Sequence, residues 1–263
     1  MHRFRFAAAT NCWRGPLTDT LRTVAALGVA GVQLDLLHEL PATSLSETGR
    51  RDFLHLVREL GLQVGTTVVP LRHPLSVEQE LDRRIDALRG AMTFAFQLRA
   101  GVVCFRCGRI PEDVHSAPAQ LLREVLTDLA RHANHVGVSL AVTPCGESPK
   151  HLAEFLASIQ SGPLGVDFDP AQYAMQGQSA TEALRELHRL VFHVQLRDGV
   201  RDLTGGGTET VLGQGAVDWI ELLALLGEMD YAGWLTAVRT QGEDRAGDVT
   251  RALKSAQRLL LGG

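Results

Sequence analysis

The chain has 263 residues, 45% of them hydrophobic, and its 30 acidic and 26 basic residues leave a formal net charge of −4 with His neutral. Without a basic patch or run, this composition argues against a nucleic-acid-binding or membrane-surface protein, and no window approaches the roughly 18 apolar residues of a transmembrane helix. Because α/β barrels commonly use ~250 residues as one domain, we expect a single domain over residues 1–263.

Short apolar runs rich in β-branched residues recur along the chain, and a longer segment of helical periodicity follows each. The predicted strands span residues 4–9, 31–36, 63–69, 102–105, 139–143, 165–168, 191–196 and 234–238. The predicted helices span residues 17–27, 46–60, 77–98, 119–135, 149–159, 180–187, 218–229 and 245–261.

Strict alternation of strand and helix predicts a parallel sheet covered by helices, and eight such units favour a closed barrel of the (β/α)8 TIM type. Gly28, Gly61 and Gly137 each follow a predicted helix, as left-handed C-caps do, while Pro118 and Pro149 stand at helix starts. The rival fold, a doubly wound open sheet, would need a glycine-rich phosphate loop after the first strand, and residues 10–16 contain one glycine.

Neither the first residues nor the cysteines indicate export. Residues 1–10 lack the long apolar region and small-residue cleavage site of a signal peptide, so we expect a cytoplasmic protein. Its four cysteines lie in or beside apolar strand-like runs, where reduced thiols are typical. Cys104 and Cys107 form a C-x-x-C without the second ligand pair of a zinc site or the helix start of a redox site, so we expect a structural role.

In a TIM barrel the functional residues lie at the C-terminal ends of the strands. Five arginines stand at those ends: Arg72, Arg106, Arg109, Arg197 and Arg239. Guanidinium groups bind phosphate and carboxylate through paired hydrogen bonds, so this set suits an anionic ligand. The alternative, which the sequence leaves open, is that the arginines pair with nearby carboxylates and only rim the barrel.

Two further features lie after the predicted seventh strand. Gly213-Gln214-Gly215 allows a sharp turn over the barrel mouth, and Asp218 is placed to cap the next helix at Ile220 or Glu221. The run from Gly205 to Gly207 reads as a flexible loop tip that could close over the site.

Several strings carry a family resemblance: GVQLDL, LGVDFDPAQYAMQG, FHVQLRD, VLGQGAVDWIELL and YAGWLTAV. Together they resemble the xylose-isomerase-like sugar phosphate isomerase/epimerase family, over most of the chain. The resemblance implies a TIM barrel whose mouth holds a divalent metal of the Mn, Mg, Zn or Co type. The family's ligands are a Glu on strand five, an Asp on strand six, a His on strand seven and a Glu on strand eight.

Carried over to this chain, those ligand positions are Thr143, Asp169, Gln195 and Val238. In addition, Gln172 replaces a family His and Gln33 a family Glu. One carboxylate with amide and hydroxyl oxygens binds a divalent cation weakly, so we expect the metal to be absent or weakly bound. A relocated site of Asp169, His193 and Glu147 is an alternative, although a hydrogen-bonded core role for His193 is preferred.

The resulting hypothesis is an isomerase- or epimerase-like barrel that binds a small anionic sugar or polyol derivative. Asp169, Gln195 and Arg197 are the candidate catalytic residues, with Asp169 as base and arginines as electrophilic support. The candidate substrate-binding residues are Gln33, Arg72, His73, Arg106, Arg109, Thr143, Gln172 and Arg239. The main alternative is a non-catalytic, ligand-binding pseudoenzyme. A metal-dependent endonuclease is the weakest candidate, and the formation of a homo-oligomer is left open.

Overall fold

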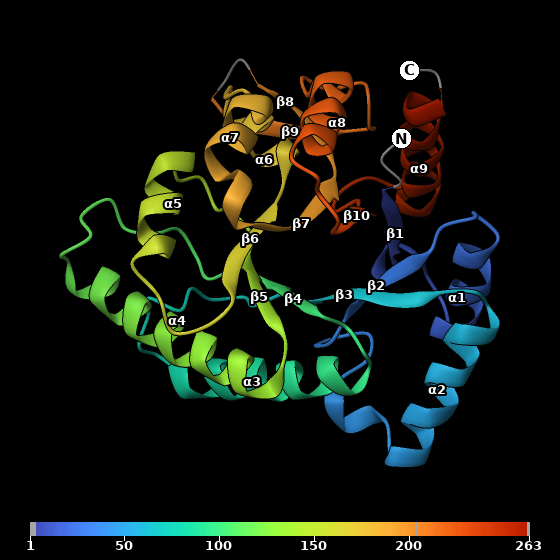
Figure 1. The fold of residues 1–263 in the computed structure, drawn as a ribbon, viewed down its shortest axis with the longest axis horizontal. Coiled ribbons are helices and arrows are strands. Elements are labelled where there is room, and N and C mark those ends of the chain that lie inside the picture. The colour runs from blue at the N-terminus through green and yellow to red at the C-terminus, as the bar shows by residue number, and fades with distance from the viewer. Residues whose placement is uncertain (1–3, 203–204, 262–263) are drawn as a thin grey trace.

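The computed structural model describes residues 4–202 and 205–261, and in this part of the chain eight parallel strands close into a barrel surrounded by helices (Figure 1). The order around the barrel is β1, β10, β7, β6, β5, β4, β3, β2, so the predicted TIM barrel is confirmed. The barrel strands are β1 (Arg5–Ala9), β2 (Gly31–Asp35), β3 (Gln63–Val69), β4 (Val102–Phe105), β5 (Ser139–Val142), β6 (Leu164–Phe168), β7 (Val191–Leu196) and β10 (Trp234–Ala237).

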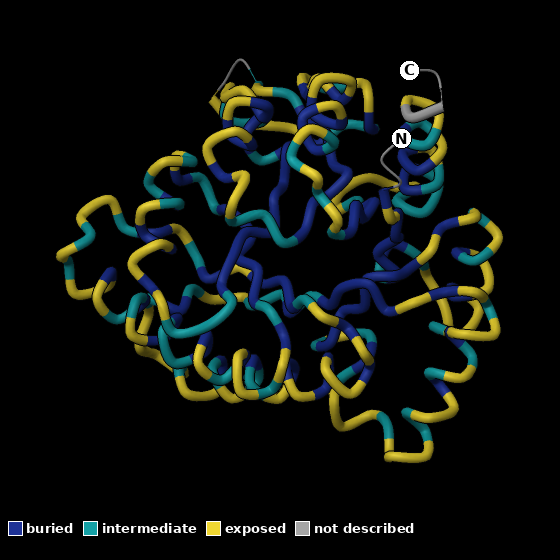
Figure 2. The backbone as a smooth tube through the Cα atoms, viewed as in Figure 1, coloured by how far each residue is buried: buried dark blue, intermediate teal, exposed yellow. Residues whose placement is uncertain are grey.

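Helices follow the strands along the chain and cover the outside of the barrel. They are α1 (Leu17–Ala25), α2 (Glu47–Glu59), α3 (Leu81–Gln97), α4 (Ala117–Val136), α5 (Pro149–Ala157), α6 (Pro170–Met175), α7 (Ala180–Leu187), α8 (Trp219–Glu228) and α9 (Arg245–Leu261). The described residues also contain three short 3-10 helices, which span Thr10–Cys12, Ala42–Ser44 and His188–Leu190. In Figure 2 the barrel strands are buried (dark blue), whereas the outward side of most helices is exposed (yellow).

The helix ends follow the sequence signals. Gly28, Gly61 and Gly137 all have positive φ angles, 72°, 71° and 92°, which glycine adopts without steric cost. The start of α3 differs from its prediction: the helix begins at Leu81 because Glu80 takes a left-handed conformation with φ 53°. No helix in the described ranges is long and apolar enough to cross a membrane.

The first and last strands close the barrel. β1 pairs with β10 through Arg5↔Trp234 to Ala8↔Ala237. The ring of Trp234 fills the N-terminal end of the barrel interior against Gly31 and Gly65, where an added Cβ would lie 2.7 Å from the indole in each case. The guanidinium of Arg5 lies 4.7 Å from the ring centroid of Trp234, a cation–π contact.

The sequence prediction omitted one supersecondary element. After β7 the chain forms an antiparallel hairpin of β8 (Asp198–Arg201) and β9 (Gly207–Thr210), which packs on α6. Gly207, expected in a flexible tip, is the first residue of β9, and residues 203–204 lie outside the described part of the chain. A Cβ on Gly207 would lie 2.3 Å from Cβ of Met175, so only glycine allows this close approach.

Candidate functional site

Asp167 organises the polar interior of the barrel below the mouth. Its carboxylate accepts hydrogen bonds at 2.6 Å from Oγ1 of Thr143 and from Nε2 of Gln195, and lies 2.6 Å from Nδ1 of His193. Burial opposes ionisation, but the His193 ring and these hydrogen bonds outweigh it and lower the pKa of Asp167. The side chains of Thr143 and Gln195 therefore serve a neighbouring carboxylate on β6.

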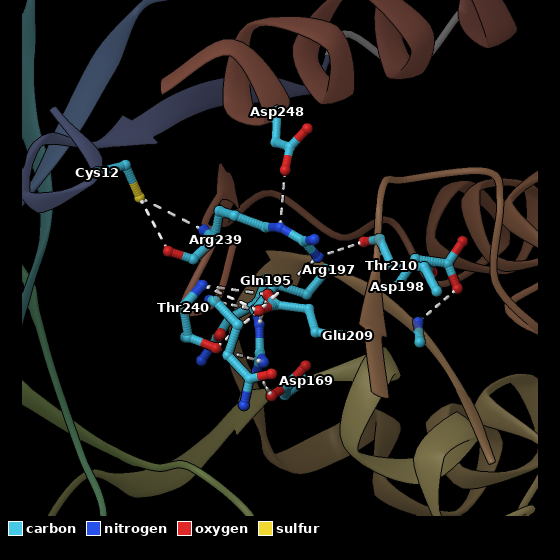
Figure 3. A network of polar contacts seen from close by, with 12 residues as sticks. Cys12, Asp169, Gln195, Arg197, Asp198, Glu209, Thr210, Arg239, Thr240 and Asp248 are labelled. Atoms are coloured by element: carbon cyan, nitrogen blue, oxygen red, sulfur yellow. Dashed lines mark hydrogen bonds and ion pairs between the residues drawn. The ribbon is translucent and has the colours of Figure 1, made fainter. Parts of the chain in front are cut away.

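A second buried network lies nearer the mouth and is centred on the guanidinium of Arg197 (Figure 3). Arg197 follows β7, and its Nη1 donates to Oδ2 of Asp169, which follows β6. Nε of the same guanidinium donates to Oε1 of Glu209 on β9 at 2.8 Å, and Nη2 donates to Oγ1 of Thr240 at 3.2 Å. Arg197 is thus held between two carboxylates from different elements.

Glu209 is the functional candidate that sequence reasoning missed. Besides Arg197, its carboxylate accepts from the backbone N–H groups of Thr240 and Gln241, the latter at 2.8 Å. Burial opposes ionisation, but Arg197 and the Thr240 hydrogen bonds outweigh it and lower the pKa of Glu209. The glycines at 205–207 are a turn signal, but the four-residue strands on either side, DGVR and GTET, show no alternating pattern that would have placed Glu209 at the mouth.

Asp169 keeps one oxygen without a partner. Its Oδ1 is buried and makes no hydrogen bond among the described residues, and the same holds for the hydroxyl of Tyr173 on α6. Desolvation raises the pKa of Asp169 even though Arg197 opposes the shift, and desolvation with nearby Glu147 and Asp169 raises the pKa of Tyr173. A buried, unsatisfied acceptor and donor on neighbouring turns offer polar contacts to a bound molecule.

The other arginines occupy different surroundings. Arg239 is held by Asp248, with Nε 2.9 Å from Oδ2, and Nη1 of Arg239 donates to the Thr210 carbonyl at 2.7 Å. Arg109 is exposed and pairs with Glu112 at 2.8 Å. Arg106 is exposed at the end of β4, and its charge offsets part of the rise that burial causes in the pKa of Asp169.

The remaining predicted substrate-binding residues are spread over the mouth. Arg72 and His73 are exposed beyond β3. Gln33 is buried on β2 and donates from Nε2 to Oγ1 of Thr66 at 3.1 Å. Gln172 is half-buried and lines a surface hollow of about 350 Å³ beside Met175 and the hairpin. The structure therefore groups Asp169 and Arg197 closely, joins Gln195 and Thr143 through Asp167, and leaves the exposed residues at the rim.

The structure does not assemble the alternative metal set of Asp169, His193 and Glu147. Nδ1 of His193 faces Asp167, and its Nε2 lies 2.7 Å from Oγ1 of Thr236. Glu147 instead accepts from the backbone N–H of Cys145 at 3.2 Å. Within the described ranges, one group of three has donor atoms within 4.8 Å of one another, and it consists of the fully buried Cys104, Asp167 and His193.

The loop over the mouth is fixed by Asp198. Its carboxylate accepts five hydrogen bonds, from the backbone N–H groups of Gly199, Gly213, Gly215 and Val217 and from Nε1 of Trp219. This anchor explains the tight course of the glycine loop over residues 211–217. The expected cap at the next helix is present, since Oδ1 of Asp218 accepts from the N–H of Glu221 at 2.9 Å.

The donor set at the family's metal positions does not fit a divalent cation. Thr143 and Gln195 offer neutral oxygens in place of a carboxylate and an imidazole and donate hydrogen bonds to Asp167, and the side chain of Val238 has no atom that can bind a metal. Asp169 remains, with one oxygen bonded to the Arg197 guanidinium. Divalent cations at such sites need several carboxylate or imidazole ligands, so the residues present are a poor match for the ion.

Comparison with known proteins agrees with this fold. The family model for the xylose isomerase-like TIM barrel matches residues 21–259. The structure is similar to a xylose isomerase domain protein from Planctomyces limnophilus, with 24% identity, a TM-score of 0.84, and coverage of 99% of this chain and 96% of that one. A comparison with the curated proteins found no match.

Two further structures resemble this chain at lower identity. A D-tagatose 3-epimerase-like protein is 18% identical with a TM-score of 0.80. The match covers 98% of this chain and 97% of that one. A xylose isomerase-like TIM barrel protein from Mycobacterium smegmatis, solved in complex with magnesium, is 16% identical with a TM-score of 0.79. The match covers 99% of this chain and 98% of that one. The chain belongs to the xylose isomerase-like TIM barrel family.

Proposed function

We propose that this protein binds a small, anionic carbohydrate-type ligand at the C-terminal mouth of the barrel and lacks the divalent-metal centre of its family. The observation that carries the proposal is the buried, unpartnered Oδ1 of Asp169 beside the charged network of Arg197. A ligand hydroxyl donating to this oxygen would satisfy it, since a buried polar group without a partner costs about 1–3 kcal/mol.

The charges at the rim support an anionic ligand of low charge. Arg197 and Arg239 are already compensated by Asp169, Glu209 and Asp248. Arg106 and Arg72 are exposed and have no ion-pair partner among the described residues. One or two guanidinium groups above an acceptor and a hydroxyl suit a sugar acid or sugar phosphate, whose anionic group faces the rim and whose hydroxyls enter the mouth.

An isomerase- or epimerase-type reaction would use Asp169 as the proton acceptor and the Arg197 guanidinium to stabilise a developing enediolate oxygen. The raised pKa of Asp169, caused first by desolvation, suits a base that must take up a proton. The hydroxyl of Tyr173, buried and unpartnered, is a candidate donor on the same side. The alternative is a pseudoenzyme that binds the ligand and performs no proton transfer.

Calorimetric titration with sugar acids, sugar phosphates and the matching neutral sugars tests the ligand class. We expect binding of the anions, at least tenfold weaker binding in Arg106→Ala, and unchanged binding in Arg99→Ala at the opposite end of the barrel. Equal binding of neutral and anionic sugars would contradict the proposal. Incubation of a bound ligand in D₂O then separates the alternatives, because an epimerase incorporates deuterium beside the carbonyl and a pseudoenzyme does not.

We also propose that the partners are small molecules, without nucleic acid or membrane contact, and that the protein acts in the cytoplasm. The net charge of −4 supports the absence of nucleic-acid and anionic-membrane partners, because polyanions attract basic proteins.

A further inference from the structure

We propose that the guanidinium of Arg197 takes the place of a divalent cation in this barrel, as a built-in positive charge that holds Asp169 and Glu209 together and keeps metal ions out. This inference takes the location of the ligand site from the proposed function. Its central claim concerns only the Arg197 guanidinium and is tested by metal binding, without a sugar ligand.

The placement of Arg197 follows from the alternation of side chains along a strand. Gln195 stands at the position of the family's strand-seven ligand, and Arg197, two residues further, points to the same side of the chain. β6 and β7 are hydrogen-bonded neighbours, so the residue after β7 reaches the carboxylate that follows β6. The guanidinium thereby meets Asp169, the single carboxylate left among the family's four ligand positions.

Burial makes this ion pair different from the surface pairs of the molecule. Arg197 is 4% exposed, Asp169 0% and Glu209 5%. A buried cation held between two carboxylates, one on the barrel and one on a hairpin, has the same electrostatic task as a bound metal ion: it compensates acidic groups that could not remain ionised together inside the protein. Oδ2 of Asp169 is occupied by the guanidinium, and a divalent ion at the same place would be repelled by its charge.

The arrangement also indicates how the built-in cation meets a ligand. Arg197 has five N–H groups, of which three are used by Glu209, Asp169 and Thr240. One N–H on Nη1 and one on Nη2 have no acceptor among the described contacts. With Oδ1 of Asp169 alongside, these groups suit an oxygen acceptor next to a hydroxyl donor, the pattern of a hydroxy acid or a hydroxy ketone.

Removal of the guanidinium tests the claim directly. In Arg197→Ala, the carboxylates of Asp169 and Glu209 face a vacated space, so we expect Mn²⁺ to bind about tenfold or more tightly than to the native protein. Binding is measured by the loss of the free Mn²⁺ signal in electron paramagnetic resonance. Methylguanidinium at millimolar concentration should compete with Mn²⁺ for that space and raise the melting temperature of Arg197→Ala more than that of the native protein.

Two control variants make the result specific. Arg197→Lys keeps a positive charge at the position and should gain no Mn²⁺ binding. The double variant Asp169→Asn/Arg197→Ala keeps the vacated space but loses the carboxylate. It should not show the tighter Mn²⁺ binding expected of Arg197→Ala. If Arg197→Ala folds and binds no more Mn²⁺ than Arg197→Lys, the proposal is overturned.

The native protein provides a test that needs no variant to fold. We expect no stoichiometric Mn²⁺ binding by the native chain at neutral pH. Stoichiometric binding that disappears in Asp169→Asn would overturn the proposal, because it would place a metal where the guanidinium lies. Neither outcome depends on sugar binding, so failure of the ligand titrations would overturn the proposed function and leave this inference standing.

Discussion

Individual carboxylates at the mouth differ in what their ionisation contributes to stability. Glu209 has a lowered pKa because Arg197 and the Thr240 hydrogen bonds outweigh the effect of burial. A group whose pKa is lower in the folded state stabilises the fold above its ordinary pKa, here 4.5, and loses that contribution as the pH falls through the lowered value. Glu147 and Asp169 have raised pKa values, chiefly through desolvation, so their ionisation at neutral pH opposes folding.

Glu209→Gln should therefore lower the free energy of unfolding at pH 7 by about 3 kcal/mol, because it leaves the buried Arg197 with one carboxylate fewer. The difference from the native protein should shrink as the pH falls below 4.5, where Glu209 of the unfolded chain takes up a proton, and should be lost once the pH passes the lowered pKa of the folded state. Urea unfolding at a series of pH values measures both effects. Glu112→Gln, at the exposed partner of Arg109, should show no such trend, and a difference that stays constant with pH would contradict the assignment.

A second residue-scale prediction concerns Asp198. Asp198→Ala removes the acceptor of five hydrogen bonds that hold the loop over residues 211–217, so we expect a loss of about 3 kcal/mol or more. Asp218→Ala, which removes only the cap of α8, should cost about 1 kcal/mol. Urea unfolding measures both variants, and equal losses would mean that the loop does not depend on Asp198.

At the scale of elements, the β8–β9 hairpin joins the mouth to α6 and carries Glu209. Gly207→Ala should push the hairpin away from Met175, because its Cβ would lie 2.3 Å from Cβ of that residue. We expect a loss of about 1–3 kcal/mol in urea unfolding and weaker ligand binding by calorimetry. Gly206→Ala is the matched control, since its nearest neighbour would be Oδ2 of Asp202 at 3.5 Å. A neutral Gly207→Ala would show that the hairpin tolerates displacement.

At the scale of the whole molecule, closure of the barrel depends on the fit of Trp234 between two glycines. Gly65→Ala would bring a Cβ to 2.7 Å from the indole, so we expect a loss of about 1–3 kcal/mol and altered tryptophan fluorescence. Gly90→Ala, on the exposed side of α3 with nothing within 4 Å, should instead stabilise by about 0.5–1 kcal/mol. Thermal and urea unfolding compare the two, and a Gly65→Ala protein as stable as Gly90→Ala would contradict this account.

The sequence predicted the barrel better than the site because strands and helices have local periodicity, whereas charge pairing is set by tertiary contacts. The runs at β3, β4 and β7 were predicted at their observed bounds. Nothing local showed that Arg197 pairs with Asp169, 28 residues earlier, or that Thr143 and Gln195 share Asp167. Glu209 was missed because it lies on a hairpin four residues per strand long, too short for a clear alternating pattern.

The pairing of β1 with β10 also constrains how the chain is made. During synthesis from the N-terminus, β1 acquires its neighbour β2 early, but its other edge stays without hydrogen-bonding partners until the residues around Trp234 have been synthesised. Open strand edges are templates for pairing with other chains. A sheet that forms before β10 has been synthesised therefore has open edges, and pairing between nascent chains through those edges competes with closure of the barrel.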